Sequence, residues 1–265
     1  MLVIANNLSF RNKKFVAAAR SGDWAPVSAM ADEVKKAGAD IINVSLSLDG
    51  DGDEKYMAGT VEAVQKAGLP LSIDSRNPAA HREAIKAAAV PVMLNYVSAD
   101  GSRAAGMAEI TGIAAQYKTD LVLYAMRKGT PHNADERLEI ISELVEKANA
   151  AGVPNERLIV DPVILHVGGG SGSGQEHAVS VQQTLYGLGE LLEPPIRTTC
   201  WLPNVSAGAP GELRYAINDT YLAMLAGLGL WSAYLDALNK ETMRTVRLIR
   251  ALKNEAVYSP ADATL

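Results

Sequence analysis

The chain has 265 residues, of which 48% are hydrophobic and 21% are charged, and its formal net charge at pH 7 is −5. This composition supplies enough apolar residues for a large core, which excludes a disordered chain, and the acidic balance argues against a nucleic-acid partner. The single cysteine, Cys200, excludes an internal disulfide and a zinc site made of several thiolates. Because the sequence has neither a signal-peptide pattern nor an apolar run of membrane-spanning length, we expect a cytoplasmic protein.

Short apolar runs alternate with segments of helical spacing along the chain. The apolar runs predict strands at residues 2–5, 39–44, 71–74, 90–95, 120–126, 157–165, 198–202 and 230–235. The helical segments lie at residues 25–37, 55–66, 79–89, 103–117, 134–151, 177–191, 212–226 and 241–254. About eight strand–helix units are typical of a (β/α)8 TIM barrel, so we expect one α/β domain over residues 1–265.

A doubly wound open sheet would show a similar alternation of strands and helices. The predicted strands are mostly continuous apolar runs, as expected for parallel strands that are buried on both faces. Polar residues follow many of these strands, whereas an open sheet gathers its ligand-binding residues at one switch point. The sequence therefore favours the barrel.

Four polar side chains stand at the ends of predicted strands, where a barrel carries its active site. They are Asp74, Asn95, Asp161 and Asn204. Two carboxylates and two carboxamides with few cations nearby form a hydrogen-bonding set rather than an anion site, because carboxylates accept paired N–H donors. The complementary ligand is a flat heterocycle with an amino-pyrimidinone edge.

Local capping offers a second interpretation of these residues. Asp74 could cap the helix that starts near Pro78, and Asp161 could cap the turn at Pro162. Capping explains either residue well when it is considered alone. It explains all four strand-end residues together less well, so both interpretations stay open at this point.

Several motifs extend the pattern beyond single residues. The segments L-S-I-D-S-R-N (71–77), V-M-L-N (92–95), L-I-V-D-P-V-I-L (158–165) and L-P-N-V-S (202–206) resemble the pterin-binding barrel family. The nearest resemblance is to methyltetrahydrofolate:corrinoid methyltransferases, including the tetrahydrofolate-side methyltransferases of O-demethylase systems. Further likeness lies in I-N-D-T-Y-L-A-M (217–224), L-W-S-A (230–233) and A-V-Y (256–258), so the resemblance covers nearly the whole chain.

The resemblance implies an enzyme of one-carbon metabolism that moves a methyl group between tetrahydrofolate and a corrinoid (cobalamin) carried by a partner protein. It implies that Asp74, Asn95 and Asp161 hold the pterin ring and that Asn204 lies near N5. Asn204 and Asp74 are the candidate catalytic residues, and Ser206 is a further candidate for substrate binding. A hydrogen bond to N5 has a chemical reason, because the nitrogen that loses the methyl group is otherwise a poor leaving group. The resemblance also implies a homodimer.

Two other functions remain open within the same fold. A dihydropteroate synthase must bind a pterin pyrophosphate, but the chain after Asn204 reads V-S-A-G-A, without a cation. A barrel that binds folate without catalysis is the other alternative, and a barrel that serves only as an interaction module stays open as a different class of function. We expect no metal site, because His166 and His177 lack a third ligand and the acidic run at 49–53 lacks the glutamate of a calcium loop. The glycine-rich segment 168–174 is expected to form a mobile lid.

Overall fold

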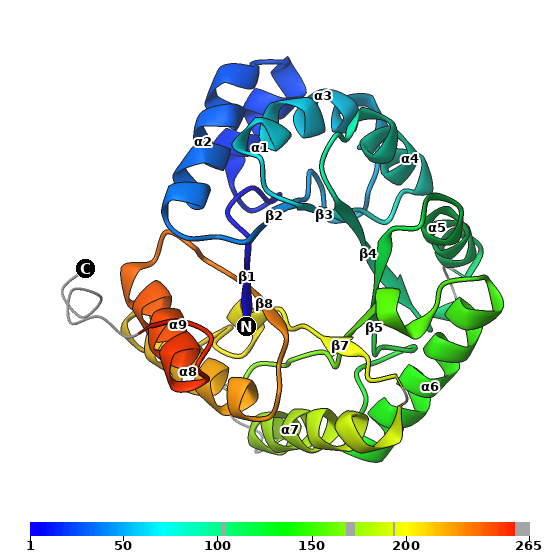
Figure 1. Ribbon diagram of the computed structural model, residues 1–265, viewed down its shortest axis with the longest axis vertical. Helices are drawn as coiled ribbons and strands as arrows, with labels where there is room; N and C mark the ends of the chain where they lie inside the picture. The colour runs from blue at the N-terminus through cyan, green and yellow to red at the C-terminus, as the bar shows by residue number, and fades with distance from the viewer. Residues whose placement is uncertain (102–103, 168–172, 193, 258–265) are drawn as a thin grey trace.

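The computed structural model describes residues 1–101, 104–167, 173–192 and 194–257. Within them, eight strands form one parallel sheet in the order β7-β6-β5-β4-β3-β2-β1-β8. The strands are β1 (Leu2–Ala5), β2 (Ile41–Val44), β3 (Leu71–Asp74), β4 (Val92–Ser98), β5 (Asp120–Tyr124), β6 (Leu158–Asp161), β7 (Arg197–Thr198) and β8 (Ser232–Leu235). The barrel closes next to β7, where Trp201 forms a parallel bridge with Tyr234. Figure 1 shows the strands as an inner ring with the helices outside it.

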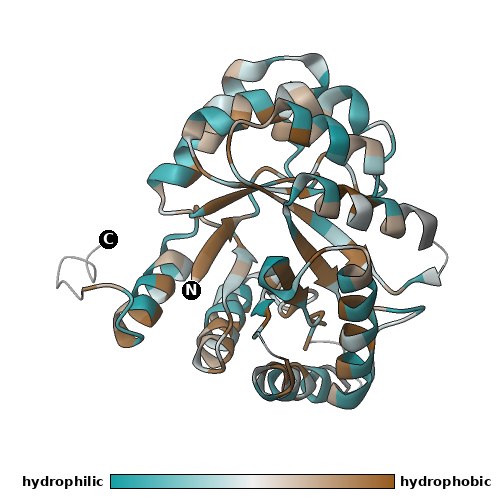
Figure 2. Ribbon diagram, turned by 45° about the vertical axis from the view of Figure 1, so that its right-hand side comes forward, coloured by the Kyte–Doolittle hydropathy of each residue, from teal (hydrophilic) through white to brown (hydrophobic). Residues whose placement is uncertain are grey.

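The helices cover the outside of the ring. They are α1 (Lys13–Ser21), α2 (Trp24–Lys36), α3 (Glu54–Val64), α4 (Pro78–Ala87), α5 (Ala104–Tyr117), α6 (Ala134–Ala150), α7 (Ser173–Leu191), α8 (Gly211–Gly227) and α9 (Lys240–Leu252). Short 3-10 helices are η1 (Gln65–Ala67), η3 (Asn155–Arg157) and η4 (Leu202–Asn204). Figure 2 shows apolar strands enclosed by helices of mixed polarity, as expected when each helix buries only one face.

The core has two layers because successive strand residues point to opposite faces. In β1, Val3 and Ala5 pack with residues of the surrounding helices, whereas Ile4 belongs to a separate cluster. That inner cluster fills the barrel and consists of Ile4, Ile41, Met93, Val122, Ile159 and Tyr234. The barrel is therefore plugged by side chains in its middle, and ligands must bind at its mouth. The prediction of a single-domain (β/α)8 barrel is confirmed.

Helix α1 was not predicted from the sequence. Its first turn is capped by Asn12, whose side chain accepts a hydrogen bond from the backbone N–H of Phe15 at 3.2 Å. It ends at Gly22, which adopts φ of 74°, a left-handed conformation that suits glycine. The cap and the glycine are both visible in the sequence, but the apolar stripe between them, Phe15, Ala18 and Ala19, is short.

Several strands differ from their predicted bounds: β2, β5 and β8 are shorter than predicted, and β4 runs on to Ser98 instead of ending at Asn95. The largest differences are in β6 and β7. The prediction extended β6 to residue 165, but the strand ends at Asp161 because Pro162 lacks an N–H and Val163 adopts φ of 65°. The prediction placed a strand at 198–202, but β7 ends at Thr198 and the chain turns into η4 at Leu202. Both differences fall at the barrel mouth, where the backbone leaves the sheet.

Candidate active site

Four residues predicted at strand ends meet in one pocket at the mouth of the barrel. Asp74, Asn95, Asp161 and Asn204 all line it. Asp74 and Asn95 lie side by side in the register of β3 and β4, and Asp161 ends β6. Asn204 reaches the pocket from η4. Ser206 does not line this pocket; it lines a neighbouring cavity on the other side of η4.

Asp74 is held at the end of β3 without serving as a helix cap. Asn77 caps α4 instead, because its side chain accepts a hydrogen bond from the N–H of Ala79 at 2.9 Å. Burial raises the pKa of Asp74 to about 6, although the Ser45 hydroxyl and the charge of Arg76 partly oppose this rise. The capping interpretation therefore fails for Asp74, whose carboxylate faces the pocket.

The Asp161 carboxylate makes a hydrogen bond within its own turn and keeps acceptor positions for a ligand. Its Oδ1 accepts a hydrogen bond from the backbone N–H of Val163 at 2.8 Å, so the turn-capping interpretation holds for this residue. Burial raises the pKa of Asp161 to about 7, although hydrogen bonds from the backbone of Val163 and of Trp201 lower it. Because an ionised carboxylate offers about four acceptor positions, these two donors leave room for two more from a ligand.

Asn95 is oriented by a buried tyrosine. Its Nδ2 donates to the Tyr234 hydroxyl at 3.2 Å, and that hydroxyl lies 2.9 Å from Ser72 Oγ. Burial raises the pKa of Tyr234, so the phenol stays neutral. The Tyr234 ring also stacks on Trp201, with ring centroids 4.6 Å apart. With its Nδ2 engaged by Tyr234, the Asn95 carboxamide has its oxygen left as an acceptor for a ligand.

The side-chain amide of Asn204 is the least constrained of the four pocket side chains. Its backbone N–H donates to the carbonyl oxygen of Trp201 at 3.1 Å, which fixes the turn of η4. Its side-chain amide has no hydrogen-bond partner in the described part of the chain. Such an amide can turn either its donor or its acceptor towards a ligand.

Two tyrosines of the pocket were missed from the sequence. Tyr96 and Tyr124 pack with their ring centroids 4.9 Å apart, and the Arg76 guanidinium lies 5.4 Å from the Tyr96 ring centre. Burial and the nearby Asp161 raise the pKa of Tyr124. Tyr124 ends β5, so its strand-end position was the signal that could have identified it. The sequence gives no comparable signal for Arg11, which reaches the pocket from the loop after β1.

The acidic and histidine residues considered as metal ligands mostly make contacts within the fold. Within residues 1–101, 104–167, 173–192 and 194–257, no cluster of three or more histidine, cysteine, aspartate or glutamate side chains could hold a metal ion. Asp53 is buried and accepts a hydrogen bond from Ser75 Oγ at 2.8 Å. His177 contacts Arg137 at 3.2 Å. Most of the proposed lid, residues 168–172, lies outside the described residues, so its role stays a prediction. No described helix could cross a membrane.

Comparisons with known proteins bear on the chemistry of this pocket. Residues 8–207 match a family described as pterin binding enzyme. The chain is 23% identical over 219 residues to the methylcorrinoid:tetrahydrofolate methyltransferase of Eubacterium limosum. The matched segment covers 82% of this chain and 78% of that protein. It is 22% identical over 235 residues to methionine synthase of Mycobacterium leprae (strain TN), covering 85% of this chain but only 19% of that protein.

Solved structures share the barrel. A dihydropteroate synthase of Xanthomonas albilineans with 4-aminobenzoic acid superposes with a TM-score of 0.69 at 19% identity, over 97% of this chain and 93% of that one. A dihydropteroate synthase from Thermus thermophilus gives a TM-score of 0.64 at 19% identity, again over 97% and 93%. At this level of identity, the likeness concerns the fold.

Proposed function

Because the chain belongs to the pterin binding enzyme family, we propose that it transfers a methyl group between N5 of tetrahydrofolate and the cobalt of a corrinoid carried by a partner protein. The observation that carries the proposal is the convergence of Asp74, Asn95, Asp161 and Asn204 on one pocket. The relative from Eubacterium limosum supports the choice of reaction within the family.

The pocket fits the pterin head of tetrahydrofolate. The amino-pyrimidinone edge presents neighbouring N–H donors, and the free positions of the Asp161 carboxylate can accept them. Asp74 and the oxygen of Asn95 offer further acceptors on the adjoining strands. These buried groups orient the ring and exclude water, so binding itself positions N5 for the reaction.

Asn204 supplies the hydrogen bond at the reacting nitrogen. When the N5–methyl bond breaks, the methyl group passes to the electron pair of reduced cobalt, and N5 needs a proton or a hydrogen bond. In the reverse direction N5 attacks the methyl group and must present its lone pair. The unpaired amide of Asn204 serves both directions, because it can donate to the lone pair or accept from N5–H.

A dihydropteroate synthase-like reaction is the second candidate. Arg11 and Arg76 line the pocket and offer the positive charge that a pterin diphosphate needs. Against it, residues 205–210 carry no cation, and β8 is followed by the acid Asp236, which accepts a hydrogen bond from Asn7 Nδ2 at 2.6 Å. Methyl transfer therefore remains the preferred function.

One anaerobic experiment separates the candidates. The protein is mixed with tetrahydrofolate and methylcob(III)alamin, which stands in for the protein-bound corrinoid. Formation of cob(I)alamin and 5-methyltetrahydrofolate, and its loss in Asn204→Ala, is the expected result. Binding of tetrahydrofolate without turnover indicates a folate-binding protein, and formation of dihydropteroate from the pterin diphosphate and 4-aminobenzoate indicates a synthase. Absence of tetrahydrofolate binding contradicts the proposal.

The proposal includes a homodimer that packs through α7 and α8. These neighbouring helices carry exposed apolar side chains, including Val179 (51% exposed), Tyr186 (68%), Leu213 (49%) and Met224 (46%). Exposed apolar side chains on neighbouring helices are a reason to expect a contact surface there. Sedimentation velocity tests this directly: a dimer is expected, and Tyr186→Glu together with Met224→Glu should give a folded monomer. A monomeric wild-type protein would contradict it.

A further inference from the structure

Helix α6 carries a completely buried arginine, Arg137, whose side chain is 0% exposed. A guanidinium keeps its positive charge in proteins, and a buried charge is costly unless hydrogen bonds or an ion pair compensate for it. Burial accordingly lowers the pKa of Arg137. Among the described residues no carboxylate forms an ion pair with it, and the adjacent Glu136 accepts a hydrogen bond from the N–H of His132 at 2.7 Å instead. Neutral acceptors therefore hold this charge.

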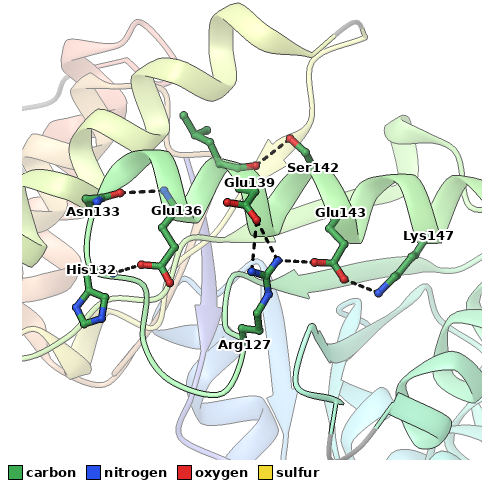
Figure 3. Close-up of polar contacts among 9 residues, drawn as sticks. Arg127, His132, Asn133, Glu136, Glu139, Ser142, Glu143 and Lys147 are labelled. Carbon is green, nitrogen blue, oxygen red and sulfur yellow. Dashed lines mark hydrogen bonds and ion pairs between the residues drawn. The ribbon is translucent and has the colours of Figure 1, made fainter.

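The nitrogens of Arg137 join three segments of the chain. Nε donates to the carbonyl oxygen of Pro162 at 2.9 Å, directly after β6. Nη1 donates to the carbonyl oxygen of Asn133 at 3.2 Å, at the start of α6 (Figure 3), and to Ser180 Oγ in α7. Nη2 donates to Nδ1 of His177 at 3.2 Å, because a guanidinium can only donate. The guanidinium thus ties α6 and α7 to the turn after β6.

The turn that Arg137 contacts carries the Asp161 carboxylate of the pocket. Val163 has φ of 65° in this turn, a left-handed conformation that is costly for a β-branched residue. Such a conformation persists only where the surrounding structure holds it. With the turn in this conformation, the Val163 N–H donates to Asp161 Oδ1 at 2.8 Å.

Arg137 and Asp161 bind opposite ends of one peptide unit. The carbonyl oxygen of Pro162 and the N–H of Val163 belong to the same planar amide, so fixing one fixes the other. Arg137 binds the oxygen and Asp161 Oδ1 binds the N–H. A cation on the carbonyl oxygen also polarises the amide, which strengthens the hydrogen bond that its N–H donates.

We propose that Arg137 is a positioning residue for pterin binding: through the Pro162–Val163 peptide it fixes the direction of the Asp161 carboxylate. One carboxylate oxygen is held by the turn, and the remaining acceptor positions face the ligand. This inference rests on the proposed function, because the pterin head is the ligand that Asp161 binds in it. The buried charge thereby acts on the pocket without touching the substrate.

Arg157 provides a matched control at the other end of the same strand. It immediately precedes β6, and its guanidinium also donates to backbone carbonyl oxygens, those of Ala114 at 3.1 Å and Gly152 at 3.0 Å. It has no ion pair with a carboxylate in the described part of the chain. Both arginines therefore bind backbone carbonyls next to β6, but only Arg137 contacts the turn at the pocket.

The test measures dissociation constants for tetrahydrofolate and for 6-methyltetrahydropterin by anaerobic calorimetry. Arg137→Lys should weaken both ligands by a similar factor of roughly 10, because one ammonium cannot reach all the acceptors of the guanidinium and the turn is held less firmly. Equal losses are expected because the affected carboxylate binds the head that the two ligands share. Arg157→Lys should leave both values at the wild-type level.

A double-mutant cycle shows whether Arg137 acts through Asp161. In the Asp161→Ala background, Arg137→Lys should cause no further loss of affinity, because the carboxylate that it positions is absent. A loss of the same factor in both backgrounds would mean that Arg137 affects binding by another route and would contradict the inference.

Glycine at position 163 separates positioning from stability. Glycine adopts φ of 65° without steric cost, so Val163→Gly in the Arg137→Lys background should restore part of the lost affinity. The melting temperature should fall further at the same time, because the Val163 side chain is buried at 3% exposure. A fall in affinity together with the melting temperature would make the role of Arg137 structural only.

Ser180→Ala guards against a folding defect in Arg137→Lys. It removes one acceptor of the Arg137 guanidinium without changing the turn, and should weaken tetrahydrofolate binding by roughly threefold. Wild-type affinity in Ser180→Ala, together with an unfolded Arg137→Lys protein, would make Arg137 a folding residue and contradict the inference.

The inference and the proposed function fail in different ways. Equal affinities of Arg137→Lys and Arg157→Lys would overturn the positioning role while leaving methyl transfer intact. Failure of the wild-type protein to bind either tetrahydrofolate or 6-methyltetrahydropterin would overturn the proposed function itself.

Discussion

The candidate active-site pocket and the neighbouring cavity that Ser206 lines share Arg11, yet the polar groups around the two cavities differ in charge and in burial. The pocket buries Asp161 and holds Asp74 at its wall, and burial raises the pKa of both. The neighbouring cavity carries the exposed Arg11 and Arg214, neither of which is paired with a carboxylate in the described part of the chain. The buried acceptors of the pocket suit a ligand that is rich in N–H donors, whereas the arginines of the neighbouring cavity stay in contact with solvent. The following predictions test this division.

The largest effect is expected in the pocket. Asp161→Ala should weaken tetrahydrofolate binding roughly 100-fold, because the N–H donors of the ligand lose a buried charged acceptor. Isothermal titration calorimetry under anaerobic conditions measures the change. Asp120→Ala is the matched control, since Asp120 begins β5 at the other end of the barrel and pairs with Arg197 at 2.8 Å. Equal affinities of the two variants would refute the role of Asp161.

The next effect separates binding from catalysis within the pocket. Asn204→Ala should slow methyl transfer roughly 10- to 100-fold, because its hydrogen bond to N5 strengthens as the bond breaks. The dissociation constant of tetrahydrofolate should change much less. Single-turnover rates and equilibrium titrations on the same variant provide the two values. Should the transfer rate and the affinity for tetrahydrofolate both fall by the same factor, Asn204 would be a binding residue only.

A smaller effect is expected from pH. Because an ionised Asp161 is the better acceptor and its pKa is about 7, tetrahydrofolate affinity should rise from pH 6 to pH 8, by up to about tenfold per unit below the pKa. Asp161→Asn should reduce this dependence to the part that Asp74 contributes, because burial also raises the pKa of Asp74, to about 6. An unchanged pH profile in that variant would assign the titration to another group.

The same carboxyl groups affect the stability of the unliganded protein with a defined sign. Burial raises the pKa of Asp161 from its ordinary 3.8 to about 7, so the folded state binds protons that the unfolded state has released. The contribution of this group to the free energy of unfolding therefore falls as pH rises between those two values. Thermal unfolding from pH 4 to pH 8 would show the trend, and Asp161→Asn should remove its part of it while the smaller contribution of Asp74 remains.

The smallest effect is expected on the paired arginine. Arg127 contacts Glu139 and Glu143 at the surface, and Lys147 also binds Glu143 (Figure 3). Exposed ion pairs add little to stability, so Arg127→Gln should shift the melting temperature by at most about 2 °C. A markedly larger shift would mean that this network supports the barrel mouth.

Local sequence patterns determined the barrel and four residues of its pocket. The apolar strand runs and helical segments predict eight units because residue spacing follows directly from backbone geometry. Polar residues at strand ends reach a common mouth in any parallel barrel, so Asp74, Asn95, Asp161 and Asn204 could be identified without contacts. The likeness to the pterin-binding family then added the pterin as ligand.

Only the tertiary structure decided which side of each turn a residue faces. The 3-10 turn of η4 directs Asn204 into the pocket and Ser206, two residues later, into the neighbouring cavity. Arg11 and Arg214 are separated by most of the chain and meet because β1 pairs with β8 when the barrel closes. Such meetings depend on barrel closure and turn geometry, and neither leaves a periodic signal in the sequence.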